Sequence, residues 1–241
     1  MSPHHISSSF DDELNSLRSK IVKMSNLVEE QYKNALIAMQ DKDQELADKV
    51  RETDRLVDQM DMEIEKQAIQ MIALRSPVAD DLRDIVSTIK ISAGLERIGD
   101  YAKNLAKRVK VLSHGKTISV SSRFIDQMIK QIREMITDVI DAYITRDIDK
   151  AIEVWRRDEE VDSLYNSLFR EMLTYMMKEP QNITLATHLL FIAKNIERAG
   201  DHATNIAELV YYINEGELLA LKRPKDDSSN YAVIEPNSEN S

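Results

Sequence analysis

Glycine and proline are scarce in this chain of 241 residues, which has only five of each. At average usage of about 7% glycine and 5% proline, a chain of this length would contain roughly 29 such residues. Tight turns, bulges and phosphate-binding loops depend on these two residues, and no G-x-G-x-x-G motif occurs. The shortage argues against a sandwich, a barrel or a Rossmann sheet and favours a few long helices.

Cysteine is absent, which excludes disulfides, thiolate metal sites and cysteine nucleophiles. No stretch approaches 18 consecutive apolar residues, and residues 1–10 do not show the pattern of a signal peptide. We therefore expect a cytoplasmic protein. The 42 acidic residues outnumber the 32 basic ones, and the net charge of −10 argues against nucleic acid or anionic lipid as a main partner.

The few glycines and prolines mark an internal repeat. Gly99 and Gly200 are 101 residues apart, and the sequence ERIGD at 96–100 returns as ERAGD at 197–201. Pro77 and Pro180 are 103 residues apart. Matches at nearly constant separation indicate two copies of one unit of about 100 residues.

Each copy has the apolar spacing of three helices. Asp43 is an expected helix start, and so is Ser76, as a cap followed by proline at the first helical position. The sequence predicts an all-α fold of two tandem three-helix bundles, 10–115 and 119–216, each running up, down and up. The polar segment 222–241 is expected to be disordered. The predicted helices cover 11–39, 43–74, 78–112, 122–144, 147–177 and 182–213.

Acidic residues form a row on the third helix of each unit. At 100° per residue, Asp100 lies about 40° and Asn104 about 80° from Glu96, whereas the apolar stripe lies at about 180–260°. This geometry predicts carboxylates that face away from the bundle core. The second unit repeats the row with Glu197, Asp201 and Asn205.

The middle helices carry matching acid pairs, Asp54 with Asp58 and Asp158 with Asp162, along the edge of the core-facing stripe. Carboxylates one helical turn apart repel each other, so a cation between them relieves a local cost. Hard oxygen ligands of this kind suit Mg²⁺, Ca²⁺, Mn²⁺ or iron. The alternative is that the acids form a solvated surface. The glycine inside each ERIGD or ERAGD motif costs about 1 kcal/mol of helix stability relative to alanine. Close approach of either a ligand or another helix would explain why glycine is present there.

The sequence LRSP at 74–77, followed by DLR at 81–83 and ERIGD at 96–100, resembles the PhoU family of phosphate-signalling regulators. The similarity runs from about residue 10 to residue 213. Two features depart from the family pattern: residues 179–182 have no Leu-Arg counterpart, and asparagine occupies positions 104 and 205.

The resemblance implies two three-helix bundles with metal sites on acidic motifs, in a homodimer. It further implies a non-enzymatic negative regulator of phosphate uptake and of the phosphate-starvation response. Its partners would be the phosphate ABC transporter ATPase and a sensor histidine kinase, with the membrane reached only through them. No catalytic residue is assigned, and the metal identity stays open among Mg, Mn, Fe, Zn and Ca. The implied metal ligands are Glu96, Asp100, Glu197 and Asp201, with the pairs Asp54–Asp58 and Asp158–Asp162.

Two other functions are compatible with a helical, acidic chain. A ferritin-like di-metal carboxylate enzyme places Glu and Glu-x-x-His inside a four-helix core, but no Glu-x-x-His occurs in this sequence. A purely structural helical adaptor would use its acidic rows only for solvation. Metal titration separates the adaptor from the regulator.

Overall fold

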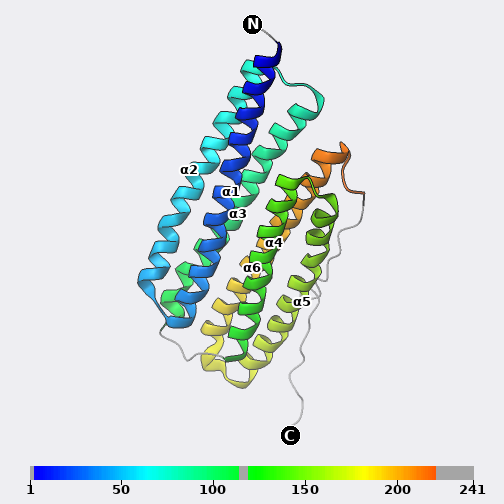
Figure 1. Ribbon diagram of the computed structural model, residues 1–241. Coiled ribbons are helices and arrows are strands. Elements are labelled where there is room, and N and C mark those ends of the chain that lie inside the picture. The colour runs from blue at the N-terminus through cyan, green and yellow to red at the C-terminus, as the bar shows by residue number, and fades with distance from the viewer. Residues whose placement is uncertain (1–2, 114–118, 221–241) are drawn as a thin grey trace.

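The computed structural model describes residues 3–113 and 119–220, with side chains from residue 10 to residue 113 and from residue 123 to residue 220 (Figure 1). Over these residues the chain forms six long helices and one 3-10 turn, and the described part contains no strand. The predicted all-α class is therefore confirmed, whereas segment 222–241 lies outside the described residues. The elements are α1 (Pro3–Asp41), α2 (Gln44–Arg75), α3 (Ala79–Leu112), α4 (Ser119–Thr145), α5 (Ile148–Lys178), η1 (Pro180–Asn182) and α6 (Ile183–Glu215).

The two units are three-helix bundles that lie side by side and pack against each other. Helices α1, α2 and α3 contact one another, and so do α4, α5 and α6 (Figure 1). Their apolar faces are buried in one continuous core that runs through both units and consists mainly of leucine, isoleucine, valine, methionine and alanine, which suits the low aromatic content. The predicted pair of bundles is thus confirmed. Fully buried examples are Leu17, Ile21, Ile64 and Ile98 in the first unit and Ile125, Met128, Leu168 and Ile196 in the second.

The repeat extends to the turn between the first two helices of each unit. Lys42 and Arg146 both adopt left-handed backbone conformations, with φ of 58° and 61°. The aspartate that follows each of them caps the next helix: Leu46 N donates to Asp43 and Lys150 N donates to Asp147, each at 3.0 Å. Asp43 is therefore the helix start that the sequence predicts.

The connection between α2 and α3 differs from the prediction. Ser76 ends α2 in a left-handed conformation, and α3 begins only at Ala79, so the expectation of a serine cap with proline at the first helical position was wrong. The sequence of this connection fits an N-terminal cap for α3. However, α2 continues to Arg75, so Ser76 serves as the C-terminal cap of α2 instead. Helix α1 also starts earlier than predicted, at Pro3 rather than near residue 11. Ser7–Ser9 weaken the helical signal there.

The units pack through α3 and α6, which run antiparallel (Figure 1). The Arg83 side chain donates to the Ile213 carbonyl, and Gly94 lies against Ile206. Near the middle, Tyr101 meets His202 with ring centroids 5.8 Å apart and 3.5 Å between the hydroxyl and Nε2. Tyr101 and His202 occupy equivalent positions in the two units, so the contact lies near an approximate two-fold axis.

A buried carboxylate also joins the units. Asp84 of α3 is 5% exposed, and it accepts a hydrogen bond from Arg18 of α1 at 2.7 Å and another from Arg146 between α4 and α5. Beside it, the Thr88 and Tyr143 hydroxyls are 2.7 Å apart. Sequence reasoning did not identify Asp84, because an aspartate in the first turns of a helix is expected to serve the helix dipole.

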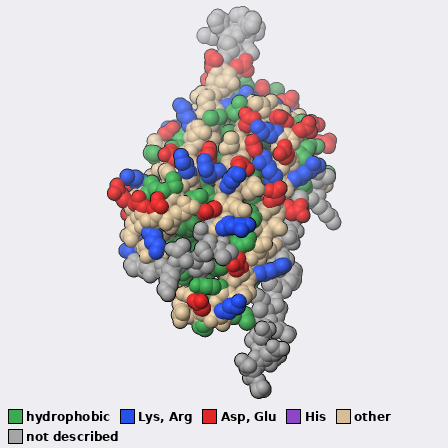
Figure 2. Space-filling model, turned by 60° about the horizontal axis from the view of Figure 1, so that its bottom comes forward, with side chains coloured by type: hydrophobic (Ala, Val, Ile, Leu, Met, Phe, Trp, Pro, Cys, Tyr) green, Lys and Arg blue, Asp and Glu red, His purple; other side chains and the backbone are tan. Residues whose placement is uncertain are grey.

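Acidic and basic side chains are interspersed over the face shown in Figure 2. None of the described helices combines the length and the apolar character that crossing a membrane requires. The viewed face is therefore charged, and neither sign of charge dominates it.

Candidate functional site

The first acidic cluster lies where α2 packs against α3. Asp54 and Asp58 project from α2, and Glu96 and Asp100 project from α3, close enough for like charges on one helix to raise carboxyl pKa values on the other. Asp61, one turn along α2, accepts a hydrogen bond from Ser92 of α3 at 2.6 Å. The two acid pairs that the sequence predicts separately thus form one cluster across a helix seam.

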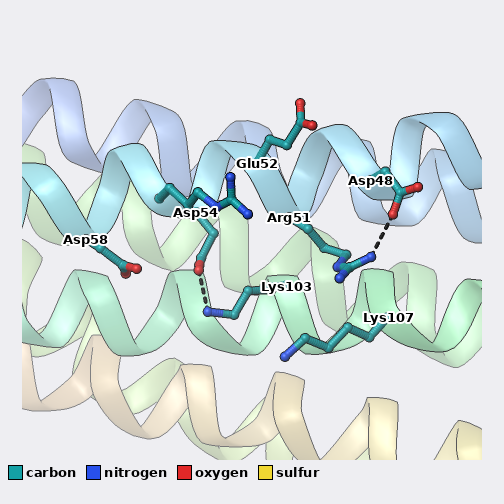
Figure 3. Close-up of a pocket in the computed structure, with 8 residues that line it drawn as sticks. Asp48, Arg51, Glu52, Asp54, Asp58, Lys103 and Lys107 are labelled. Atoms are coloured by element: carbon teal, nitrogen blue, oxygen red, sulfur yellow. Dashed lines mark hydrogen bonds and ion pairs between the residues drawn. The ribbon is translucent and has the colours of Figure 1, made fainter.

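A lysine lies inside this cluster. Lys103 of α3 donates to Asp54 of α2 (Figure 3). It also forms an ion pair with Asp100 on its own helix, at 2.5 Å between Nζ and Oδ1. Burial lowers the pKa of Lys103, but the hydrogen bonds to Asp100 and Asp54 outweigh it and hold the pKa well above its ordinary value. Sequence reasoning missed this residue, although it lies seven positions after Glu96 and so only about 20° from it on the helical wheel.

Burial and crowding disfavour ionisation of the remaining acids. Burial raises the pKa of Asp58, and the Asp54 carboxylate raises it further. Burial likewise raises the pKa of Glu96, to which the Asp100 charge adds, while Arg97 opposes both. These carboxylates therefore repel one another as they stand, and a bound cation would relieve the repulsion.

The second unit repeats the cluster in a more enclosed form between α5 and α6. Asp158, Asp162 and Glu197 are buried, and Asp201 is half-buried. Lys194 donates to Oε1 of Glu197 at 2.9 Å, whereas Oε2 is buried and accepts no hydrogen bond from the described residues. Burial raises the Glu197 pKa, Lys194 lowers it, and the charges of Asp201 and Asp162 raise it again.

These positions correct one expectation. The carboxylates of α3 and α6 were predicted to face away from the core, yet Glu197 is only 5% exposed, and Glu96 and Asp100 are partly covered. The helical wheel placed the acids correctly opposite the apolar stripe, but it could not show that a neighbouring helix covers that side. The acids lie in seams between helices, not on open surface.

The glycines inside the two motifs are explained by packing. A methyl group on Gly99 would lie 2.9 Å from Oε1 of Gln31, and one on Gly200 would lie 2.7 Å from Oδ1 of Asp158. Side chains of neighbouring helices therefore occupy the space that alanine would need. Gly200 in particular makes room for a carboxylate of the second cluster.

The donor set suits a hard cation, although it is not preassembled. Both clusters offer carboxylate oxygens from two helices, and the buried Oε2 of Glu197 is an available acceptor. Across the described ranges, no three such side chains converge closely enough to hold a metal ion in their present rotamers. Coordination would therefore require side chains of both helices to change rotamer.

Comparisons with known proteins agree with the repeat. The PhoU domain model matches this chain twice, at residues 21–109 and 125–210. Both matches fall inside the predicted units 10–115 and 119–216. The spacing of the two matches reproduces the duplication seen in the glycines.

Curated relatives and solved structures extend the likeness to almost the whole chain. A phosphate-specific transport system accessory protein PhoU homolog of Caulobacter vibrioides is 46% identical over 92% of this chain and 97% of its own length. The Rhizobium meliloti homolog is 45% identical over 94% of this chain and 96% of its own length. The crystal structure of PhoU from Pseudomonas aeruginosa superposes with a TM-score of 0.82 at 38% identity, covering 86% of this chain and all of that one. The crystal structure of PhoU from Streptococcus pneumoniae superposes with a TM-score of 0.81 at 31% identity, covering 88% of this chain and all of that one. The resemblance found in the sequence is therefore confirmed, and this chain belongs to the PhoU family.

Proposed function

We propose that this chain is a cytoplasmic, non-enzymatic regulator of phosphate uptake and of the phosphate-starvation response. It acts by binding the ATPase of a phosphate ABC transporter and a sensor histidine kinase, as a homodimer. The observation that carries the proposal is membership of a family whose relatives are named accessory proteins of the phosphate-specific transport system. The charged helical surface of Figure 2 suits protein docking.

The two acidic clusters are proposed to bind divalent or iron-type cations. Their occurrence at equivalent positions in both units supports this role, because one acid pair on one helix is ordinarily only solvated surface. Burial and neighbouring carboxylates raise the pKa values of Asp58, Glu96 and Glu197, so the charged forms of these side chains are disfavoured. A cation would neutralise that charge and tie together the two helices of each seam.

Calorimetric titration tests the metal role. Chelator-treated full-length protein is titrated with Mn²⁺ and Mg²⁺, and we expect saturable binding that is lost when Glu96, Asp100, Glu197 and Asp201 are replaced by their amides. A matched control replaces four exposed acids elsewhere by glutamine, which removes the same charge: Glu30, Glu65, Glu153 and Glu159. Equal binding by both variants would contradict the metal role and favour a structural adaptor.

Co-purification tests the partner role. Immobilised full-length protein is incubated with the purified transporter ATPase or with the kinase cytoplasmic domain, at low and at high phosphate. We expect retention that depends on phosphate status. No retention of either protein under high phosphate would refute the partner role and leave the metal result unaffected.

A further inference from the structure

The first acidic cluster contains its own positive charge. Lys103 reaches across the seam and contacts Asp54, whose side chain is only 3% exposed, while it also contacts Asp100 on its own helix. The ammonium group thus bonds oxygens from both helices, as a bound cation would. Both carboxylates belong to the set proposed above to bind metal.

An ammonium group and a divalent cation that bind the same carboxylates repel each other and compete for the same oxygen lone pairs. The Lys103 side chain is a compact charge on a flexible stem, so it can leave without unfolding the helix. A cavity of about 440 Å³ adjoins it, lined by Asp48, Arg51 and Glu52 among others (Figure 3). Asp48 already pairs with Arg51 at 2.7 Å, and Arg51 and Lys107 also line the cavity, so the displaced ammonium would be hydrated there and not bound to a new carboxylate.

The two units place their internal lysines differently. The position equivalent to Lys103 in the second unit is Thr204, whose hydroxyl donates to the Asp201 carbonyl. Lys194 instead contacts Glu197, and its equivalent in the first unit is Ala93. The repeat therefore conserves the carboxylates but changes which carboxylate a lysine neutralises.

We propose that Lys103 is the resident cation of the first cluster, and that a divalent metal binds there only by displacing it. The proposal rests on the metal role stated under the proposed function. Lys103 then sets the affinity of the first cluster below the value that its carboxylates alone would give. It also keeps Asp54 and Asp100 in place when metal is scarce.

The test measures Mn²⁺ binding to full-length protein in which Glu197→Gln and Asp201→Asn disable the second cluster. Lys103→Met removes the charge and keeps the side-chain length, and Lys103→Thr installs the residue of the second unit. We expect each to bind Mn²⁺ at least about tenfold more tightly than the parent, because a charge-assisted contact no longer has to be broken. Lys103→Arg keeps the charge and is expected to stay within about threefold of the parent.

Lys107→Met is the matched control, because it removes the same charge one turn further along α3 from an exposed side chain. We expect it to change the Mn²⁺ affinity by less than about twofold, since exposed charges are screened. Thermal unfolding gives a second readout: without metal Lys103→Met should melt below the parent, and Mn²⁺ should raise its Tm by more than that of the parent.

The outcomes separate this proposal from the metal role. Equal affinity in the parent and in Lys103→Met, or an equal gain from Lys107→Met, would overturn the displacement proposal and leave metal binding intact. If neither the parent nor any Lys103 variant binds Mn²⁺, the metal role of the first cluster fails and the displacement proposal fails with it. Binding that appears only when Lys103 is replaced would support displacement in its strongest form.

Discussion

Replacing Asp84 by alanine should weaken the contact between the two units. The Asp84 carboxylate is buried and accepts hydrogen bonds from Arg18 and Arg146, and each charge-assisted bond contributes about 1.5–3 kcal/mol. The two arginine side chains are 25% and 29% exposed, so they can turn partly toward water once the carboxylate is gone. We therefore expect a loss of about 2–4 kcal/mol, below the full cost of stranding two buried charges.

Urea unfolding of metal-free protein measures this loss with two probes. Far-UV circular dichroism follows both helical units, whereas Trp155, the single tryptophan, lies in α5 and reports on the second unit. The two transitions should coincide in the parent and separate in Asp84→Ala, because the units lose a shared ion pair. Asp84→Asn keeps one acceptor oxygen and should lose roughly half as much stability.

Two comparisons make the Asp84 result decisive. Glu65→Ala removes the same charge from an exposed face of α2 and should change stability by no more than about 0.5 kcal/mol. A double-mutant cycle between Asp84→Ala and Arg146→Ala should show a coupling of at least about 1 kcal/mol. A loss no larger than that of Glu65→Ala, or a coupling near zero, would refute the role of Asp84 as a junction between units.

Three further substitutions test the packing of the bundles. Gly200→Ala should destabilise the fold by about 1–3 kcal/mol, because its methyl group would lie 2.7 Å from a buried carboxylate oxygen. Gly99→Ala should be close to neutral in the same urea assay, because the one atom within 3.0 Å of its methyl group is the terminal amide oxygen of Gln31, the valine contacts at 3.4 and 3.6 Å are ordinary, and alanine favours the helix. Equal losses at the two glycines would contradict this difference. Tyr32→Phe should be neutral or stabilising by up to about 1 kcal/mol near pH 7, because the buried hydroxyl has no hydrogen-bond partner among the described residues. Burial raises the pKa of Tyr32 well above its ordinary value, so the unfolded chain loses this proton first and the stability falls as the pH rises past about 10. Tyr32→Phe should make this fall in stability shallower. An unchanged dependence of stability on pH would contradict the role given to the Tyr32 hydroxyl.

The sequence predicted the architecture well because its signals are local and repeated. Five of the six helices both begin and end within about three residues of the predicted limits, and Asp43 caps α2 as expected. Ser76 was assigned to the wrong helix because the same residue type can end one helix or start the next. The domain limits 10–115 and 119–216 stay predictions at their ends.

The candidate site was predicted in composition but not in environment. The helical wheel found the acids of each helix, yet it treats a helix alone, so it could not show that Asp54 and Asp100 meet across a seam or that Glu197 is buried. Lys103 is not part of a recognisable sequence motif. Its contact with Asp54 becomes visible only once α2 is packed beside α3. Asp84 was missed for the same reason, since both of its partners come from distant segments of the chain.

The meeting of Tyr101 with His202 has a consequence for how this fold is assembled. Equivalent positions that touch each other form a self-complementary contact, which closes on two units and offers no face for a third. A single unit would have to find its partner by diffusion, whereas the linked pair meets at an effective concentration of about millimolar. The duplication thus turned an association that would depend on protein concentration into a permanent feature of one chain, and it left each half free to diverge, as lysine and threonine have done at positions 103 and 204.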